Sequence, residues 1–216
     1  LSSSSAASDV YKRQVLNVVT GAGPVSGQAL AMSMDVDALA FTGSGSVGRQ
    51  LMEAAAKSNL KRVFLELGGK SPHIVFDDTT DLDKAAEAVV AGIFRNSGQV
   101  CVAGSRLLVH DTIHDAFVKK IVGLTEKLQV GDPLDLSTQI GALSSEGHMN
   151  RIQKALEGVH SVVSGGMQIL SETGGFYIAP TIVTNIGVSD RLVREEVFGP
   201  VPVSYTHLTL PTKRIV

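Results

Sequence analysis

The sequence has few of the features that would link it to a disulfide scaffold, a membrane or nucleic acid. Its single cysteine, Cys101, excludes an internal disulfide and a multi-cysteine metal site, and fits a reducing, cytoplasmic setting. No apolar run reaches the roughly 18 residues of a transmembrane helix, so no membrane span is expected. The formal net charge of −2 leaves no basic footprint for nucleic acid. The composition, 44% hydrophobic and 19% charged, is that of a soluble globular protein.

The two ends of the chain are related to each other through their codons. Residues 1–14 can be back-translated into DNA whose reverse complement encodes residues 203–215. Such an inverted repeat resembles a sequencing-library adapter translated at both ends of an insert. We therefore assign residues 1–14 and 203–216 to adapter and exclude them from fold reasoning. We expect them to make no core contacts. A central strand packed there would contradict the adapter origin, and we attribute any other helix or strand formed there to local propensity. Residues 15–201 are then expected to be a piece of a longer protein.

Strand and helix signals alternate between these ends. Short apolar or alternating runs predict strands at residues 15–19, 38–41, 61–67, 74–76, 106–110, 161–164 and 178–183. Helices are predicted at residues 26–34, 47–57, 82–94, 113–128 and 144–156, and Asp81 is the expected N-cap of the third. This alternation predicts α/β layers around a mostly parallel sheet.

A glycine turn after the second predicted strand suggests a phosphate site. Gly43-Ser-Gly-Ser-Val-Gly48 matches G-x-G-x-x-G and opens a helix, the context that the dinucleotide fingerprint requires. Its glycines would admit a pyrophosphate to the backbone, and the helix N-terminus would supply free N–H groups. The alternative is a tight strand–helix turn without a ligand.

Glu66 lies about 20 residues further on, where a Rossmann dehydrogenase places its ribose ligand. It also lies between two leucines and before Gly68-Gly69, where partial desolvation would raise the pKa of its carboxyl and suit a general base. A solvated charge at the strand end is the third interpretation.

Cys101 lies in a loop with glycines at 98 and 104. A cysteine nucleophile needs such a loop, because its backbone N–H groups can receive an oxyanion. The alternative is a small buried side chain, which is common for free cysteine.

Four motifs in this order resemble the NAD(P)-dependent aldehyde dehydrogenase family, and the resemblance covers essentially all of residues 15–201. They are Phe41-Thr-Gly-Ser-Gly-Ser-Val-Gly48, Leu65-Glu-Leu-Gly-Gly-Lys-Ser-Pro72, Gly98-Gln-Val-Cys-Val-Ala-Gly-Ser-Arg106 and Glu195-Glu-Val-Phe-Gly-Pro-Val201. Details around Cys101 are most similar to the branch that acts on γ-glutamyl-γ-aminobutyraldehyde and other ω-amino aldehydes.

The resemblance implies a role for each matched residue. Cys101 would attack the aldehyde, and Glu66 would activate the water that hydrolyses the thioester. The Cys101 N–H would form half of the oxyanion hole. For the cofactor, NAD or NADP, Ser44 would hold the pyrophosphate beside Gly43 and Gly48. Glu196 would bind the nicotinamide ribose, and Phe198 would pack near the nicotinamide.

The resemblance also divides the chain, with part of a Rossmann-type cofactor domain at residues 15–67 and an incomplete catalytic domain at 68–202.

Two positions depart from the family pattern. Gly45 replaces the usual Thr, so we interpret the G-x-G-x-x-G match as accidental. His73 replaces the common Asn, and we interpret it as a surface substitution. The full-length protein is expected to form a homodimer or homotetramer, whereas the 216-residue chain is expected to be inactive. A plain Rossmann dehydrogenase with Glu66 on the ribose remains the alternative, and a non-enzymatic family member is the third.

Overall fold

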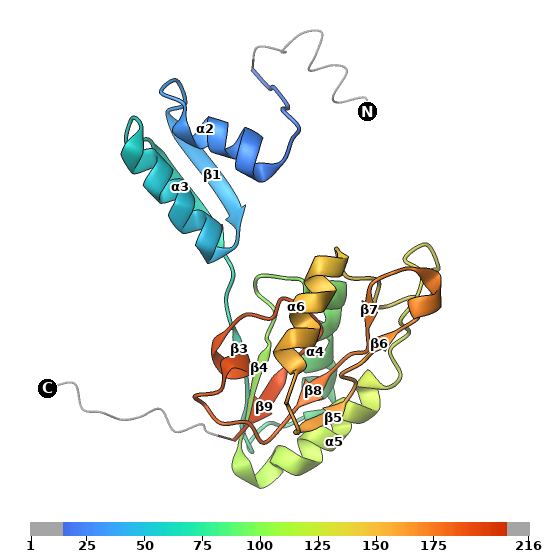
Figure 1. Cartoon of the computed structure of the whole chain (residues 1–216). Helices are drawn as coiled ribbons and strands as arrows, with labels where there is room; N and C mark the ends of the chain where they lie inside the picture. The colour runs from blue at the N-terminus through green and yellow to red at the C-terminus, as the bar shows by residue number, and fades with distance from the viewer. Residues whose placement is uncertain (1–14, 207–216) are drawn as a thin grey trace, which may run out of the picture. The chain divides into compact units, whose positions relative to one another are not determined.

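The computed structural model describes residues 15–206, so most of the predicted adapter sequence, at 1–14 and 207–216, lies outside the described residues. The chain divides into two compact units, Leu1–Leu67 and Gly68–Val216 (Figure 1). The assignment of cofactor and catalytic roles to these two parts of the chain stays a prediction.

The first unit is a two-stranded parallel sheet with helices on one face. Strand β1 (Ala38–Gly43) pairs with β2 (Arg62–Leu67), and helices α2 (Gln28–Met32) and α3 (Gly45–Lys57) pack beside them. Side chains alternate between the two faces of a strand. The alternate residues Leu39, Phe41 and Val63 therefore share one face, which packs against Ala31 of α2 and Leu51 and Ala54 of α3.

The buried Lys61 connects α2 to the end of α3 through hydrogen bonds. The Lys61 side chain is only 6% exposed. Its ammonium donates to the carbonyl oxygens of Ala31 and Ser33 and to the hydroxyl of Ser58. Three acceptors satisfy all three donors of the ammonium, which offsets the desolvation of a buried charge.

The strand predicted at residues 15–19 is absent, and that prediction is wrong. Val15 and Val18 are 80% and 81% exposed, and no strand pairs with this run in the described part of the chain. An apolar run becomes a strand only where another backbone satisfies its N–H and C=O groups. The predicted helix 26–34 is also shorter than expected, because a π-helical turn at Gly23–Gly27 precedes α2 and the chain is extended at Ser33.

The second unit is built on a five-stranded sheet in the order β3-β4-β9-β8-β5. All neighbouring pairs are parallel except β8 with β5, so the prediction of a mostly parallel sheet is confirmed. In that order, the strands are Pro72–Val75, Arg106–Val109, Val203–Tyr205, Ile182–Val183 and Val162–Ser164. A separate antiparallel pair is formed by β6 (Gln168–Ile169) and β7 (Tyr177–Ile178).

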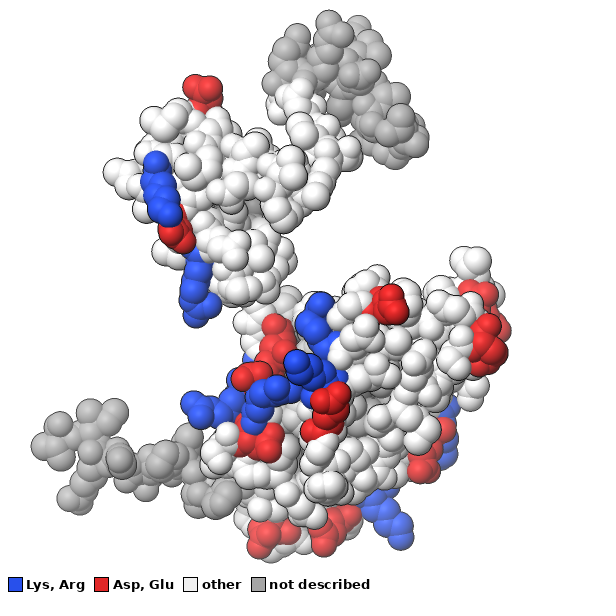
Figure 2. Space-filling model, viewed as in Figure 1, with Lys and Arg blue, Asp and Glu red and all other residues white. Residues whose placement is uncertain are grey.

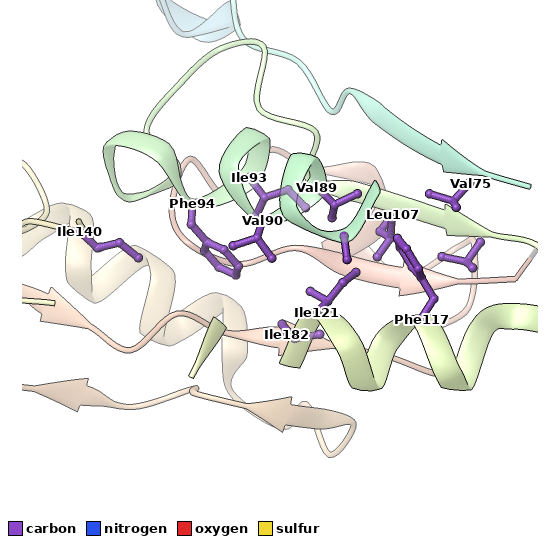
Figure 3. Packing of buried hydrophobic residues seen from close by; sticks show 12 residues of the cluster. Val75, Val89, Val90, Ile93, Phe94, Leu107, Phe117, Ile121, Ile140 and Ile182 are labelled. Atoms are coloured by element: carbon purple, nitrogen blue, oxygen red, sulfur yellow. The ribbon is translucent and has the colours of Figure 1, made fainter. Parts of the chain in front are cut away.

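Helices cover both faces of this sheet. On one face lie α4 (Leu82–Phe94) and α5 (His114–Thr125), which enclose an apolar cluster with Leu107 and Val109 of β4 (Figure 3). On the other lie α6 (Glu146–Leu156) and α7 (Arg191–Arg194), with Val183 and Val203 in their cluster. The predicted N-cap is confirmed, because the Asp81 side chain accepts from the Lys84 N–H at the start of α4.

Strand β9 contradicts the expectation that residues 203–216 make no core contacts. Val203 and Ser204 are 0% and 1% exposed, and β9 lies between β4 and β8. Ladder bonds use only backbone groups, and Val and Tyr are good strand formers. Residues 203–205 therefore have both the backbone groups and the strand propensity to pair with β4 and β8. A buried central strand is also the result that we expected to contradict the adapter origin, so β9 argues against that origin for residues 203–205.

The single strand predicted at residues 178–183 is divided in two. Strand β7 ends at Ile178 and β8 begins at Ile182, with Pro180 between them. Proline has no N–H to donate to a ladder. The interruption therefore lets the two halves pair with different partners, β6 and β5.

Candidate active site

The Gly43–Gly48 turn of the first unit presents a helix N-terminus. Ser44 is the N-cap of α3, and its hydroxyl accepts from the Val47 N–H at 3.4 Å. A Cβ atom on Gly48 would meet the side chains of Leu67 and Leu65 at 3.0 and 3.4 Å. Gly48 therefore allows α3 to approach β2 closely, the packing role of the last glycine in a dinucleotide fingerprint. The turn thus leaves the first N–H groups of α3 for an anion.

Glu66 lies at the carboxyl end of β2, next to the end of β1. It pairs with Thr42 in the sheet, one residue before Gly43. Because Leu65 and Leu67 contact α3 at Gly48, the intervening Glu66 belongs to the opposite face. The side chain is exposed, so the expected desolvation between the two leucines is wrong. Alternation in the strand sends the leucines to one face and the carboxylate to the other.

The Cys101 loop of the second unit has an unusual backbone. Three successive residues before it, Asn96, Ser97 and Gly98, have φ angles of 51°, 56° and 69°. Non-glycine residues adopt this left-handed region at a cost that surrounding contacts must offset. Cys101 itself is exposed. Its N–H makes no hydrogen bond within residues 15–206, so this donor is available to an oxyanion.

Hydrogen bonds hold the Cys101 loop in this conformation. The buried Ser97 hydroxyl donates to the Gly141 carbonyl oxygen at 2.8 Å, and the Gln99 side chain accepts from the Ser144 N–H at 3.0 Å. His73 lies behind the loop, where a Cβ on Gly104 would meet its ring. It is partly buried, so its interpretation as a surface substitution is wrong, and burial lowers the pKa of His73.

The Glu196 carboxylate is fixed on the Gly68-Gly69 backbone. Its Oε1 atom accepts from the Gly69 N–H at 3.1 Å. A Cβ on Gly68 would overlap the same carboxylate, and a Cβ on Gly69 would lie 3.6 Å from the Cys101 carbonyl oxygen. Gly69 therefore lies between the Glu196 carboxylate and the Cys101 loop. These two residues are 127 and 32 positions away from Gly69 along the chain, and they meet only in the folded structure.

Lys70 follows this turn and is a charged neighbour of Glu196. Its Nζ atom is buried and has no hydrogen-bond partner among the described residues. Burial, and then repulsion by Arg106, lower the pKa of Lys70 to about 8, while Glu196 acts in the opposite direction. A buried ammonium without a hydrogen-bond partner costs stability, although it also holds positive charge beside the Glu196 carboxylate.

Phe198 has a left-handed backbone, with φ of 56°. A bulky residue rarely adopts this conformation unless its neighbours impose it. Its carbonyl oxygen lies 2.7 Å from His148 Nε2, and the residue as a whole is 39% exposed. The next residue, Gly199, packs against Ile152 of α6 so closely that a Cβ there would overlap that side chain. Helix α6 therefore shapes this segment.

The second unit thus brings together Cys101, Glu196 and Phe198, while Gly43, Ser44, Gly48 and Glu66 lie in the first unit. Sequence reasoning missed Lys70 and His148. Lys70 was visible only as the charge after a Gly-Gly pair. No local pattern marks His148, whose partner lies 50 residues away.

Other features of the described residues lie apart from this site. An apolar groove of about 580 Å³ between α4 and α5 contains none of the predicted site residues. Among residues 15–206, no three His, Cys, Asp or Glu side chains cluster as a metal site would require. No described helix is both long and apolar enough to cross a membrane. On the face shown in Figure 2, Lys and Arg side chains are interspersed with Asp and Glu.

Comparison with known proteins identifies the family. The sequence model of the aldehyde dehydrogenase family matches residues 8–207. Aldehyde dehydrogenase 1 of Tanacetum cinerariifolium is 46% identical over 192 residues, which are 87% of this chain and 38% of that protein. The chain therefore belongs to the aldehyde dehydrogenase family, and it spans less than half the length of this relative.

Solved structures show the same relationship. An indole-3-acetaldehyde dehydrogenase from P. syringae, solved with NAD⁺, is 45% identical with a TM-score of 0.88 over 90% of this chain and 40% of that one. A γ-glutamyl-γ-aminobutyraldehyde dehydrogenase from Burkholderia cenocepacia is 46% identical with a TM-score of 0.83, over 89% of this chain and 40% of that one. The prediction of an aldehyde dehydrogenase-like α/β fold is thereby confirmed.

Proposed function

We propose that the protein oxidises an aldehyde to a carboxylic acid with NAD or NADP, through a covalent intermediate on Cys101. The observation that carries this proposal is the junction at Gly69, which joins the Cys101 loop to the Glu196 carboxylate. An exposed thiol beside a free backbone N–H can form a covalent adduct and stabilise its oxyanion.

The residues of the first unit fit a dinucleotide. The α3 N-terminus presents free N–H groups, and Ser44 lies at its start with an exposed hydroxyl. Arg49 lies near the turn, with its Nη1 atom 3.5 Å from a Cβ built on Gly45. An N-terminal helix end with a nearby cation suits a pyrophosphate. We assign Gly43, Ser44 and Gly48 to this contact, Glu196 to the nicotinamide ribose and Phe198 to the nicotinamide.

The chemistry of the thiol follows in three steps. The Cys101 thiolate adds to the aldehyde carbon, and its backbone N–H stabilises the oxyanion of the thiohemiacetal. When bound, the nicotinamide cofactor supplies the acceptor for the hydride that leaves this carbon, which oxidises the adduct to a thioester. Water then attacks the thioester carbon, which releases the carboxylic acid and regenerates the thiol.

We assign the activation of that water to Glu66 as general base. An exposed carboxylate at a strand end is accessible to water and can accept its proton. The alternative, a plain Rossmann dehydrogenase with Glu66 on the ribose, is favoured by the register that places Glu66 beside the end of β1. The face that Glu66 occupies, opposite to α3, argues against it.

Substrate, cofactor choice and assembly extend this proposal. The γ-glutamyl-γ-aminobutyraldehyde dehydrogenase among the similar structures supports an ω-amino aldehyde as substrate. The structure solved with NAD⁺ supports NAD as the cofactor. We further propose a cytoplasmic homodimer or homotetramer for the full-length protein.

The test is Cys101→Ala in the full-length enzyme. We expect aldehyde-dependent cofactor reduction to disappear while cofactor binding persists, because the thiol is the only nucleophile of its kind in this chain. Cofactor binding, measured by fluorescence of the reduced form, controls for folding. Substantial aldehyde oxidation by the variant would remove Cys101 from the mechanism.

A further inference from the structure

The buried His148 uses both of its ring nitrogens. It lies in the first turn of α6 and is 5% exposed. Its Nε2 atom lies 2.7 Å from the carbonyl oxygen of Phe198, and its Nδ1 atom lies 3.0 Å from Nη2 of Arg151. This side chain therefore links α6 to the segment that carries Glu196 and Phe198.

The chemistry of the two partners fixes the protonation of the ring. A carbonyl oxygen can only accept, so Nε2 must carry the hydrogen and donate it to Phe198. A guanidinium can only donate, so Nδ1 must offer its lone pair to Arg151. Together these contacts select the neutral Nε2–H tautomer. Arg151 thus orients the ring, and the ring in turn donates to Phe198.

Phe198 depends on such support because its backbone is left-handed. The His148 and Phe198 rings also meet edge to face, with centroids 6.1 Å apart and planes at 64°. One helical turn after His148, Ile152 packs against Gly199. Helix α6 therefore contacts this segment at three points: the Phe198 carbonyl oxygen, the Phe198 ring and Gly199.

We propose that His148 is a positioning residue, which orders Phe198 for the nicotinamide half of the cofactor. The inference rests on the proposed function, since Phe198 is assigned to the nicotinamide there. A segment ordered in advance loses less conformational freedom when the cofactor binds. Loss of the His148 hydrogen bond to Phe198 should therefore lower the cofactor affinity more than the turnover rate of the saturated enzyme.

A matched pair of variants separates the hydrogen bond from simple packing. In His148→Gln, the amide nitrogen can occupy the place of Nε2 and donate to Phe198. In His148→Asn, one methylene shorter, the amide reaches only the place of Nδ1. In the full-length enzyme we expect His148→Gln to bind NADH like the wild type. His148→Asn should bind it about three- to tenfold more weakly, the usual effect of one lost hydrogen bond, with kcat less affected.

Equal NADH affinity of the Gln and Asn variants would overturn the proposal. An inactive wild-type enzyme would contradict the proposed function instead, so the two failures are distinguishable. A second measurement needs neither activity nor a folded variant. In ¹⁵N NMR spectra of the full-length enzyme near neutral pH, His148 should be the Nε2–H tautomer. An Nδ1–H tautomer or a charged ring would also overturn the proposal.

Discussion

Gly98 and Gly199 touch backbone to backbone, and no side chain fits between them. A Cβ atom on Gly98 would overlap the carbonyl group of Gly199, and the φ of Gly98 is 69°. The cysteine loop and the segment that carries Glu196 and Phe198 therefore meet at a contact that only glycine permits. The position of Cys101 relative to the proposed cofactor residues depends on it.

Gly98→Ala should disrupt this contact. The added methyl group meets backbone, which cannot rotate away as a side chain can, and it also disfavours the positive φ. We expect the variant to lose several kcal/mol of stability, as overpacking and strain do when combined. Urea unfolding followed by circular dichroism measures this loss.

The matched control is Gly123→Ala in α5, where a Cβ meets nothing within 4 Å. A glycine in a helix destabilises by roughly 0.5–1 kcal/mol relative to alanine, so this variant should be neutral or more stable. Equal stability of the two variants would show that the Gly98 contact contributes nothing.

Gly68→Ala should displace the Glu196 carboxylate without unfolding the chain. The overlapping group is the end of a flexible side chain, which can move at little cost. If Glu196 binds the nicotinamide ribose, the KM for the cofactor should rise in the full-length enzyme. Gly69→Ala is the control, because its Cβ would make only ordinary contact, 3.6 Å from the Cys101 carbonyl oxygen. An unchanged cofactor KM in Gly68→Ala would contradict the ribose assignment.

Glu66→Gln separates the two roles proposed for this carboxylate. A general base acts after hydride transfer, so the variant should still give a rapid burst of reduced cofactor, followed by slow turnover. General-base assistance contributes about 10²–10⁴-fold in rate, so the slowing should be large. Stopped-flow absorbance in the full-length enzyme measures both phases. A raised cofactor KM with no burst would instead support the ribose ligand.

Lys70→Met should make the second unit more stable at neutral pH. The pKa of Lys70 is about 8 in the folded chain, below its ordinary value of 10.5. Between these values the unfolded chain binds more protons, so the stability of the wild type rises with pH across this window. Below about pH 8 the charged, buried ammonium destabilises the folded state. Its removal should add about 1–3 kcal/mol.

The gain from Lys70→Met should shrink as the pH rises from about 8 to 10.5, because Lys70 of the wild type becomes neutral in the folded state. Urea unfolding at both ends of this range measures the difference. A variant that is less stable than the wild type at pH 7 would show that the attraction between Lys70 and Glu196 outweighs the cost of burial.

Local sequence patterns predicted those helices and strands whose determining residues all lie within the same short segment. Helix α4 begins and ends where its apolar face and its Asp81 cap predict. Its N-cap bond spans three residues, so the sequence alone specifies it. The strand predicted at residues 15–19 failed because a strand depends on a partner that the segment cannot supply.

The sequence by itself determined the family, the order of its four motifs and the alternation of strands and helices, because these depend on residue identity and short spacing. Only the tertiary structure decided which distant residues meet. It brought the Glu196 carboxylate to the Gly69 N–H, the His148 ring to the Phe198 carbonyl oxygen and Val203–Tyr205 into the sheet. Such contacts join segments that are far apart in the chain, so burial and hydrogen bonding at these positions follow from packing and leave no local pattern.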